Sequence, residues 1–177
     1  RPESNLKGDH GQSFLIKYRD LQILVDVGAK SKILLHNMEE LNINPDEITH
    51  LIFTHGHYDH TLGLPGFLDE RTNNTPLTIY AHPNVQETKI AKIFFLKKNI
   101  GFPELSETQE KKIAFEYINE LKEIFSKIWL SGEIKERPYK TGAEKRALHK
   151  EKGKFVVDPI WDDLSIILET LKGLVIV

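Results

Sequence analysis

Residues 54–60 read THGHYDH, so three histidines and one aspartate fall within a very short stretch of chain. His55 and His57 are separated by one residue, and in an extended backbone both side chains project to the same side. Asp59 and His60 follow directly and can face a second ion. Neutral imidazole suits zinc and iron, and a carboxylate adds negative charge that helps hold two cations close together. The pattern predicts a metal centre made by His55, His57, Asp59 and His60.

The flanks of this motif predict its place in the fold. Residues 48–53 (ITHLIF) form an apolar run of the length expected for a buried strand. Residues 61–66 (TLGLPG) contain the small residues and the proline of a loop or a short helix. The candidate ligands therefore sit where a buried strand opens into a loop, which is a common place for function. We favour this interpretation over a set of surface histidines on a turn.

The remaining chain predicts alternating strands and helices. Apolar residues recur at helical spacing in 31–41 and 108–127, and the second of these is the longest expected helix. Residues 135–154 are rich in charges of both signs, which favours a solvated connection over a phosphate-binding segment. Ile52, Phe53, Val25 and Ile79 are expected in the core. The expected strands form hairpins at 13–18 with 21–27 and at 164–169 with 174–177, and lie singly at 48–53, 77–81 and 128–134.

Composition sets limits on the class of protein. The 177 residues are 40% hydrophobic and 28% charged, which is ordinary for one globular domain. The sequence contains neither an apolar run of the ~20 residues that cross a membrane nor a signal-peptide pattern at its start. With no cysteine there are no disulfides and no thiolate ligands. We expect a cytoplasmic protein without a membrane partner.

Taken together, the apolar strand, THGHYDH and the glycine-rich loop resemble the metallo-β-lactamase superfamily. Residues 21–28 (LQILVDVG) resemble its early strand and Asp-x-Gly turn, and residues 79–83 (IYAHP) resemble the strand after the metal motif. One branch is similar over nearly the whole chain: that of the archaeal dihydropterin–ribofuranosylaminobenzene phosphate synthases and their relatives. The segments that resemble this branch are residues 9–14 (DHGQSF), 35–37, 130–134 (LSGEI) and 162–177.

The resemblance implies an α/β fold (α+β), a four-layer αββα sandwich of two similar halves with metals between them. In that family a third histidine follows a strand that resembles Gly173 to Val177, and this sequence stops at Val177. It also starts at Arg1 without the family's first strand. We therefore expect residues 1–177 to be a single but incomplete domain, holding the first half and the start of the second. Four ligands are present in this interpretation, and at least two are absent.

Five further residues are candidates for holding the ligands in place or meeting the substrate. The resemblance makes Asp26, beside a glycine at a strand end, a group that orients the histidine loop. His10 precedes a glycine near the expected pocket, where substrate contact and an ordinary loop role remain equally open. His82 also ends a strand, and a hydrogen-bonded turn histidine is the favoured interpretation there. Glu133 lies at a strand interruption and Asp163 just before a predicted strand, and for each a surface role remains the alternative.

The expected chemistry depends on two divalent ions, with zinc as the first choice and manganese, iron or magnesium as alternatives. Such a pair lowers the pKa of a bound water toward ~7 and polarises an electrophile. Asp59 would bind the second ion and help to direct the nucleophile, which makes it the candidate catalytic residue. In the branch that the chain resembles, the reaction is instead condensation of a dihydropterin diphosphate with an arylamine. Both interpretations imply a small-molecule substrate, phosphorylated in the second case.

Two other classes of function remain as alternatives. Some nucleases of the superfamily carry the same ligand run, but a net charge of −2 and the lack of an aromatic and basic stripe argue against nucleic acid as the partner. A redox diiron protein or a metal-binding scaffold without turnover is the other. The related flavodiiron enzymes usually have glutamate where this chain has His57, which weakens the diiron interpretation. The oligomeric state is left open.

Overall fold

The computed structural model describes residues 5–73, 75–137 and 144–177, and its central element is a five-stranded sheet. The strand order is β1-β2-β3-β4-β7, in which β1 pairs antiparallel with β2 and the other neighbours are parallel. The five strands are β1 Phe14–Tyr18, β2 Leu21–Val25, β3 His50–Ile52, β4 Leu77–Ala81 and β7 Ile113–Tyr117. The expected hairpin at 13–27 and the strands before and after the metal motif are confirmed.

Alternation along these strands creates two separate cores, one on each face of the sheet. Ile23 and Val25 belong to one apolar cluster, whereas Leu24 between them belongs to the other. Successive side chains of a strand point to opposite faces, so both faces of this sheet must be covered. The four residues predicted for the core, Ile52, Phe53, Val25 and Ile79, are fully buried.

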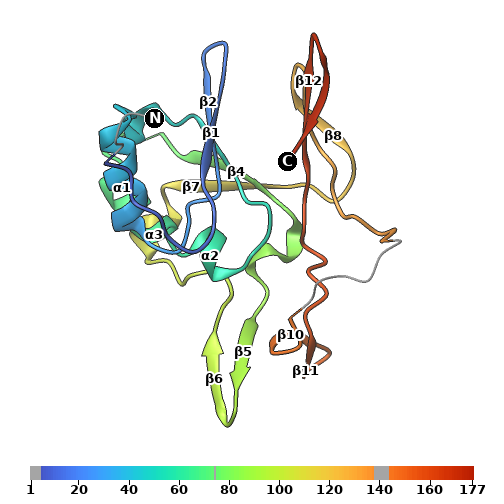
Figure 1. Cartoon of the computed structure of the whole chain (residues 1–177). Helices are drawn as coiled ribbons and strands as arrows, with labels where there is room; N and C mark the ends of the chain where they lie inside the picture. Colours follow the sequence, from blue (N-terminus) through green and yellow to red (C-terminus); the bar gives the residue numbers. More distant parts are fainter. Residues whose placement is uncertain (1–4, 74, 138–143) are drawn as a thin grey trace.

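Helices cover the first face. Helix α1 (Ser31–Glu40) confirms the expected helix at 31–41 and buries Leu34 and Met38. Helix α3 (Leu64–Glu70) packs beside it and buries Phe67 in the same cluster. Both helices lie on the same side of the central sheet (Figure 1). The shorter elements are α2 Tyr58–Thr61, α4 Glu107–Glu110, η1 Pro45–Glu47 and η2 Pro83–Gln86.

A second sheet covers the other face, so the layers run helices, sheet, sheet (Figure 1). Its antiparallel order is β13-β12-β9-β8. Ile128, Leu130 and Ile166 from this sheet pack against Ile23 and Val25 of the central sheet. The strands are β8 Lys122–Phe125, β9 Ile128–Leu130, β12 Ile166–Thr170 and β13 Gly173–Ile176. This αββ stacking is the start of the expected αββα sandwich, and the hairpin at 164–177 is confirmed.

The expected long helix at 108–127 is wrong. Helix α4 is short and begins with a capping box, in which Ser106 and Gln109 exchange hydrogen bonds. The chain then forms strand β7, which pairs with β4. Strand β8 follows β7 in the chain. Ile113 and Tyr117 fit a helical period, whereas Ile113 and Phe115 fit a strand period. The contact of Ile113 and Phe115 with the helix-side core decides in favour of the strand.

A third sheet was not expected at all. Its antiparallel order is β11-β10-β5-β6, and the β5–β6 hairpin extends away from the two packed sheets (Figure 1). The segment expected as a solvated connection, 135–154, is therefore in part a strand, although residues 138–143 lie outside the described part of the chain. The pairing of β10 with β5 joins residues far apart in sequence, which local pattern does not report. The strands are β5 Lys89–Ile93, β6 Leu96–Asn99, β10 Ala147–Glu151 and β11 Lys154–Val157.

Candidate metal centre

The THGHYDH motif lies at the carboxyl end of the central strand. It begins two residues after β3, which is flanked by the parallel strands β2 and β4. Asp26 follows β2 and His82 follows β4, so both come to the same edge of the sheet as the motif. Carboxyl ends of parallel strands are the usual location of sites in open α/β sheets.

The four predicted ligands lie together in a small cluster. The ring centroid of His55 is 4.9 Å from that of His57 and 4.1 Å from that of His60. A carboxylate oxygen of Asp59 lies 3.7 Å from Nε2 of His60 and 3.4 Å from Nε2 of His10. The local fold thus groups three imidazoles and a carboxylate, with a fourth imidazole beside the carboxylate.

Asp26 is hydrogen-bonded to Thr54 and His60 of the motif. Its fully buried carboxylate accepts hydrogen bonds from the backbone N–H of Thr54 (2.9 Å), from Oγ1 of Thr54 (2.8 Å) and from Nδ1 of His60 (2.7 Å). Burial raises the pKa of the Asp26 carboxyl, against the opposing effect of the His60 and Thr54 hydrogen bonds. Because both carboxylate oxygens already accept hydrogen bonds from Thr54, we assign the shared proton to Nδ1 of His60. The Nε2 atom of His60 then carries a free electron pair.

The surroundings shift the pKa values of His60 and His55 in opposite directions. Burial alone would lower the pKa of His60, but the hydrogen bond and the charge of Asp26, together with the charge of Asp59, raise it. His55 behaves in the opposite way. Burial, followed by the neighbouring charges of His60 and His57, lowers the pKa of His55 to about 2. At neutral pH His55 is therefore an uncharged imidazole, which is the form that binds metals.

The hydrogen-bond pattern also selects one nitrogen on each of the other two histidines. Oγ1 of Thr54 gives its proton to Asp26, so at 3.3 Å from Nδ1 of His55 it can only accept, which leaves Nε2 of His55 free. Nε2 of His57 lies 2.9 Å from a carboxylate oxygen of Asp158, a residue from the far end of the chain. A carboxylate accepts only, so His57 donates from Nε2 and keeps Nδ1 free.

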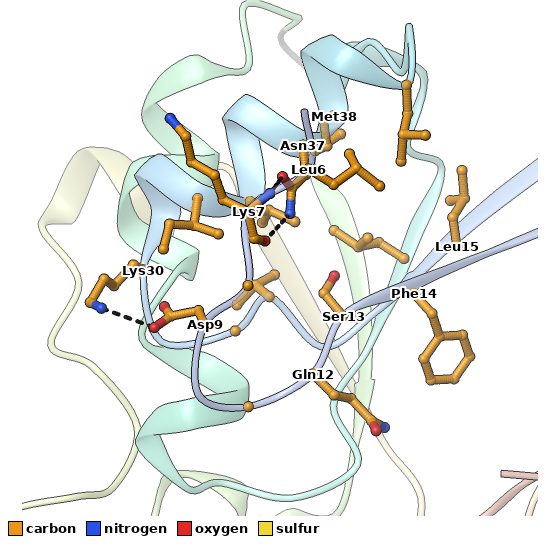
Figure 2. A pocket seen from close by; sticks show the side chains of 18 of the residues that line it. Leu6, Lys7, Asp9, Gln12, Ser13, Phe14, Leu15, Lys30, Asn37 and Met38 are labelled. Carbon is orange, nitrogen blue, oxygen red and sulfur yellow. Dashed lines mark hydrogen bonds and ion pairs between the residues drawn. The ribbon is translucent and has the colours of Figure 1, made fainter. Parts of the chain in front are cut away.

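The remaining sequence candidates are distributed around this cluster. His10 stacks on Tyr58, with ring centroids 6.1 Å apart, and the following Gly11 packs against the backbone of Asp59. The same loop lines a cavity of about 420 Å³, which lies between residues 6–15 and α1 (Figure 2). Its rim includes the ion pair of Lys30 with Asp9 at 2.9 Å. His10 and Gly11 also line this cavity, so the N-terminal loop contacts both the cavity and the candidate centre.

His82, Glu133 and Asp163 occupy different surroundings. Nδ1 of His82 accepts a hydrogen bond from the backbone of Asn84 at the start of η2, as a turn histidine would. His82 and Glu133 line a shallow cavity of about 380 Å³ together with Trp161. Burial raises the pKa of the Asp163 carboxyl against the opposing charge of Arg137, and the charges of Asp162, His60 and Asp26 also act on it. Of the three, Asp163 is the one whose carboxyl is coupled to the histidine cluster.

A divalent metal fits the chemistry of the donor set. His55, His57 and His60 each keep one free nitrogen, and Asp59 adds a carboxylate beside them. Carboxylate or hydroxyl partners on the other ring nitrogens are characteristic of metal-binding histidines. Within the described residues, no group of three His, Asp or Glu side chains is spaced so that its members could bind one metal ion jointly. Support for a metal therefore comes from donor chemistry and hydrogen bonding.

Sequence reasoning missed Lys89, Asp158 and the particular role of Thr54. Asp158 and Lys89 lie about a hundred and about thirty residues after the motif, and neither stands in a recognisable pattern. Thr54 is part of the quoted motif, but only its hydrogen bonds show that it links Asp26 to two histidines. No local signal would have identified the first two residues, because their contacts depend on the third sheet.

Comparison with known proteins agrees with the fold. The sequence model of the Metallo-beta-lactamase superfamily matches residues 6–115. The chain therefore belongs to the metallo-beta-lactamase superfamily. In the part of the chain that the structure describes, none of the helices has the length and apolar character needed to traverse a bilayer.

Individual relatives extend this finding. The chain is 32% identical to the 7,8-dihydropterin-6-methyl-4-(beta-D-ribofuranosyl)-aminobenzene-5'-phosphate synthase of Methanocaldococcus jannaschii, over 95% of this chain and 60% of that protein. It is 37% identical to Ribonuclease Z of Nanoarchaeum equitans, over 58% of this chain and 33% of that protein. The crystal structure of Tm1679, a metal-dependent hydrolase of the beta-lactamase superfamily, superposes with a TM-score of 0.69 at 20% identity, over 98% of this chain and 60% of that one. The chain thus spans about 60% of the length of the relatives it matches most fully.

Proposed function

We propose that this chain carries the metal-binding half of a metal-dependent enzyme that acts on a small-molecule substrate at a two-metal site. The observation that carries the proposal is the hydrogen-bond pattern around the motif. Thr54, Asp158 and Asp26 each engage one ring nitrogen of His55, His57 and His60 respectively and leave the other nitrogen free. Three imidazoles with one free nitrogen each, beside a carboxylate, form a donor set suited to zinc.

In this proposal each side chain has a defined task. His55 and His57 would bind one ion through Nε2 and Nδ1, and Asp59 with Nε2 of His60 would bind the other. When bound, such a pair supplies a Lewis acid and a nucleophilic water at neutral pH. Oδ2 of Asp59 also lies 3.4 Å from Nε2 of His10, so His10 would orient this carboxylate or meet the substrate.

The class of substrate is proposed from the extent of the similarities. Similarity to the archaeal synthase covers 95% of the chain, whereas similarity to Ribonuclease Z covers 58%. The synthase therefore supports a phosphorylated pterin-type substrate and transfer chemistry, with hydrolysis of a small ester as the related reaction. The net charge of −2 also gives little attraction for a polyanion.

Similarity to Ribonuclease Z supports one second candidate, an RNA-processing nuclease. The chain is 37% identical to that protein over 58% of its own length, against 32% identity to the synthase over 95%. A single screen separates the two. Zinc-loaded and manganese-loaded protein is offered phosphoesters, lactones, pterin diphosphates with an arylamine, and precursor RNA, with the His57→Ala/His60→Ala variant as the control. Turnover of a small molecule that the variant loses supports the proposal. Cleavage of RNA alone, or equal turnover by the variant, contradicts it.

A further inference from the structure

Lys89, the first residue of β5, places a buried positive charge close to the candidate centre. Its side chain is 2% exposed, and its Nζ lies 2.5 Å from Oδ1 of Asp162 and 3.4 Å from Oδ2 of Asp158. Both aspartate side chains are also almost fully buried, at 1% and 2% exposure. Charges withdrawn from water this completely are retained only where they are paired, so the three side chains form one unit.

Both aspartates of this unit also contact the metal-binding turn. Oδ2 of Asp162 accepts the backbone N–H of Gly56 at 2.7 Å, and Oδ2 of Asp158 accepts from Nε2 of His57 at 2.9 Å. The backbone N–H of Leu164 adds a hydrogen bond to the carbonyl of Thr54 at 2.8 Å. Residues 158–164 therefore contact three positions of the segment 54–57, although they lie about a hundred residues away in sequence.

The turn has little freedom at this contact. A Cβ atom on Gly56 would lie 2.0 Å from the carbonyl oxygen of Val85 and 3.1 Å from Oδ2 of Asp162. Only glycine fits between these two groups. The backbone of the turn is thus enclosed on one side by the chain after β4 and on the other by Asp162.

We propose that Lys89, Asp158 and Asp162 form a positioning clamp that fixes the ring of His57 and selects Nδ1 as its metal-binding nitrogen. None of the three touches substrate or metal in this proposal, which rests on the proposed metal-binding function. Lys89 holds the two carboxylates in place, Asp162 fixes the backbone at Gly56, and Asp158 holds the proton of His57 on Nε2. Metal binding at the motif then depends on the third sheet and on residues 158–162.

A purely structural ion pair would have a different signature. Such a pair would attach β5 to residues 158–162 and affect only stability. The clamp additionally determines which nitrogen of His57 bears the proton, and this is readable in metal-free protein by nitrogen-15 NMR of the histidine rings. A His57→Gln spectrum assigns the His57 signals.

Asp158→Asn is the central variant, because it keeps the size of the side chain and removes only its charge and its strictly accepting character. We expect His57 to change from the Nε2–H form to a mixture of both forms. Zinc affinity, measured by competition with a chelating dye, should fall by about 10- to 100-fold, the range seen when such outer partners of metal ligands are removed. Circular dichroism checks that the variant is folded.

Lys89→Met tests the cation, with Lys92→Met on the same strand as the matched control, since Lys92 is exposed. We expect the Lys89 variant to lose zinc affinity and the control to keep it. If Lys89→Met does not fold, Asp158→Asn alone decides.

Three outcomes separate the clamp from the proposed function. Wild-type His57 in the Nε2–H form, with affinity lost in folded Asp158→Asn, supports the clamp. A folded Asp158→Asn protein with unchanged His57 signals and zinc affinity within about twofold of wild type would overturn it. If the wild type binds no metal, the proposed function fails, and the His57 proton position in the two metal-free proteins still decides whether the clamp exists.

Discussion

Replacing Asp26 by Asn should move the ring proton of His60 from Nδ1 to Nε2 while leaving the backbone in place. Asp26 has a positive φ of 53°, a conformation that asparagine tolerates well, so the substitution adds no backbone strain. The amide retains one accepting oxygen, which can keep the hydrogen bond from the backbone of Thr54. Its NH2 group would then face Nδ1 of His60 and donate to it. His60 must in that case carry its own proton on Nε2, the nitrogen proposed to bind the metal.

The magnitude follows from the three hydrogen bonds of Asp26. Two of them, from Oγ1 of Thr54 and Nδ1 of His60, lose a charged acceptor. A hydrogen bond to a charged group contributes about 1.5–3 kcal/mol and a neutral one about 1, so the two changes sum to roughly 1–4 kcal/mol. Removing a fully buried charge acts in the opposite direction, and we expect a net loss of about 1 kcal/mol. Zinc affinity should fall by about 100-fold, because the ring then presents the wrong nitrogen.

Urea unfolding and zinc competition measure the two effects on the same samples. Asp20→Asn is the matched control, since Asp20 is exposed in the turn between β1 and β2. A folded Asp26→Asn protein that binds zinc as tightly as Asp20→Asn does would refute the assigned proton position. A large loss of stability with no change in zinc affinity would likewise show that Asp26 supports the fold and not the site.

Three further predictions concern pH, backbone and fold. Folding lowers the pKa of His55 from 6.5 to about 2, so the stability contributed by its buried neutral ring is complete above pH 6.5 and declines below it by up to about 1.4 kcal/mol per pH unit. In urea unfolding, metal-free His55→Gln should therefore lose stability less steeply than the wild type between pH 6.5 and pH 4. Equal slopes for the two proteins would contradict the buried neutral ring. Gly11→Ala should lower stability by roughly 1–3 kcal/mol and weaken zinc binding, because the new Cβ would lie 1.7 Å from the carbonyl oxygen of the motif aspartate. Gly8→Ala, with nothing within 4 Å, should change neither quantity, and equal effects of the two variants would count against the close contact. Nζ of Lys112 donates to the carbonyls of Leu68 and Arg71 at 2.7 and 2.9 Å, so Lys112→Met should lower stability in thermal unfolding by roughly 1–3 kcal/mol without changing zinc affinity. Lys111→Met is the control, since Lys111 is exposed. Equal Tm values for the two variants would show that these hydrogen bonds do not stabilise the fold.

The parts of the fold that were predictable are those in which neighbours in sequence carry the signal. The apolar run before the motif and the expected hairpin at 13–18 with 21–27 indicated central strands, and helical spacing indicated α1. The motif itself indicated the sheet edge at which the candidate ligands gather. Each of these patterns is read within about ten residues.

The errors arose where distant residues decide the structure. The spacing of Ile113 and Tyr117 fits a helix, but pairing with β4 makes a strand of the segment. Lys89 and Asp158 had no local pattern, because β10 must first pair with β5 and residues 158–162 must return to the motif. Such contacts depend on tertiary packing, which overrides local preference.

The central claim is tested most directly by titrating metal-free protein with zinc in an isothermal calorimeter. The same titration of the His57→Ala/His60→Ala variant is the comparison. We expect the wild type to bind zinc, and X-ray absorption of the complex to give zinc–nitrogen distances of ~2.0–2.1 Å. The double variant should bind far more weakly, because it lacks one free imidazole nitrogen for each proposed ion. Equal zinc binding by the two proteins, or no binding by the wild type, would contradict a metal centre at residues 54–60.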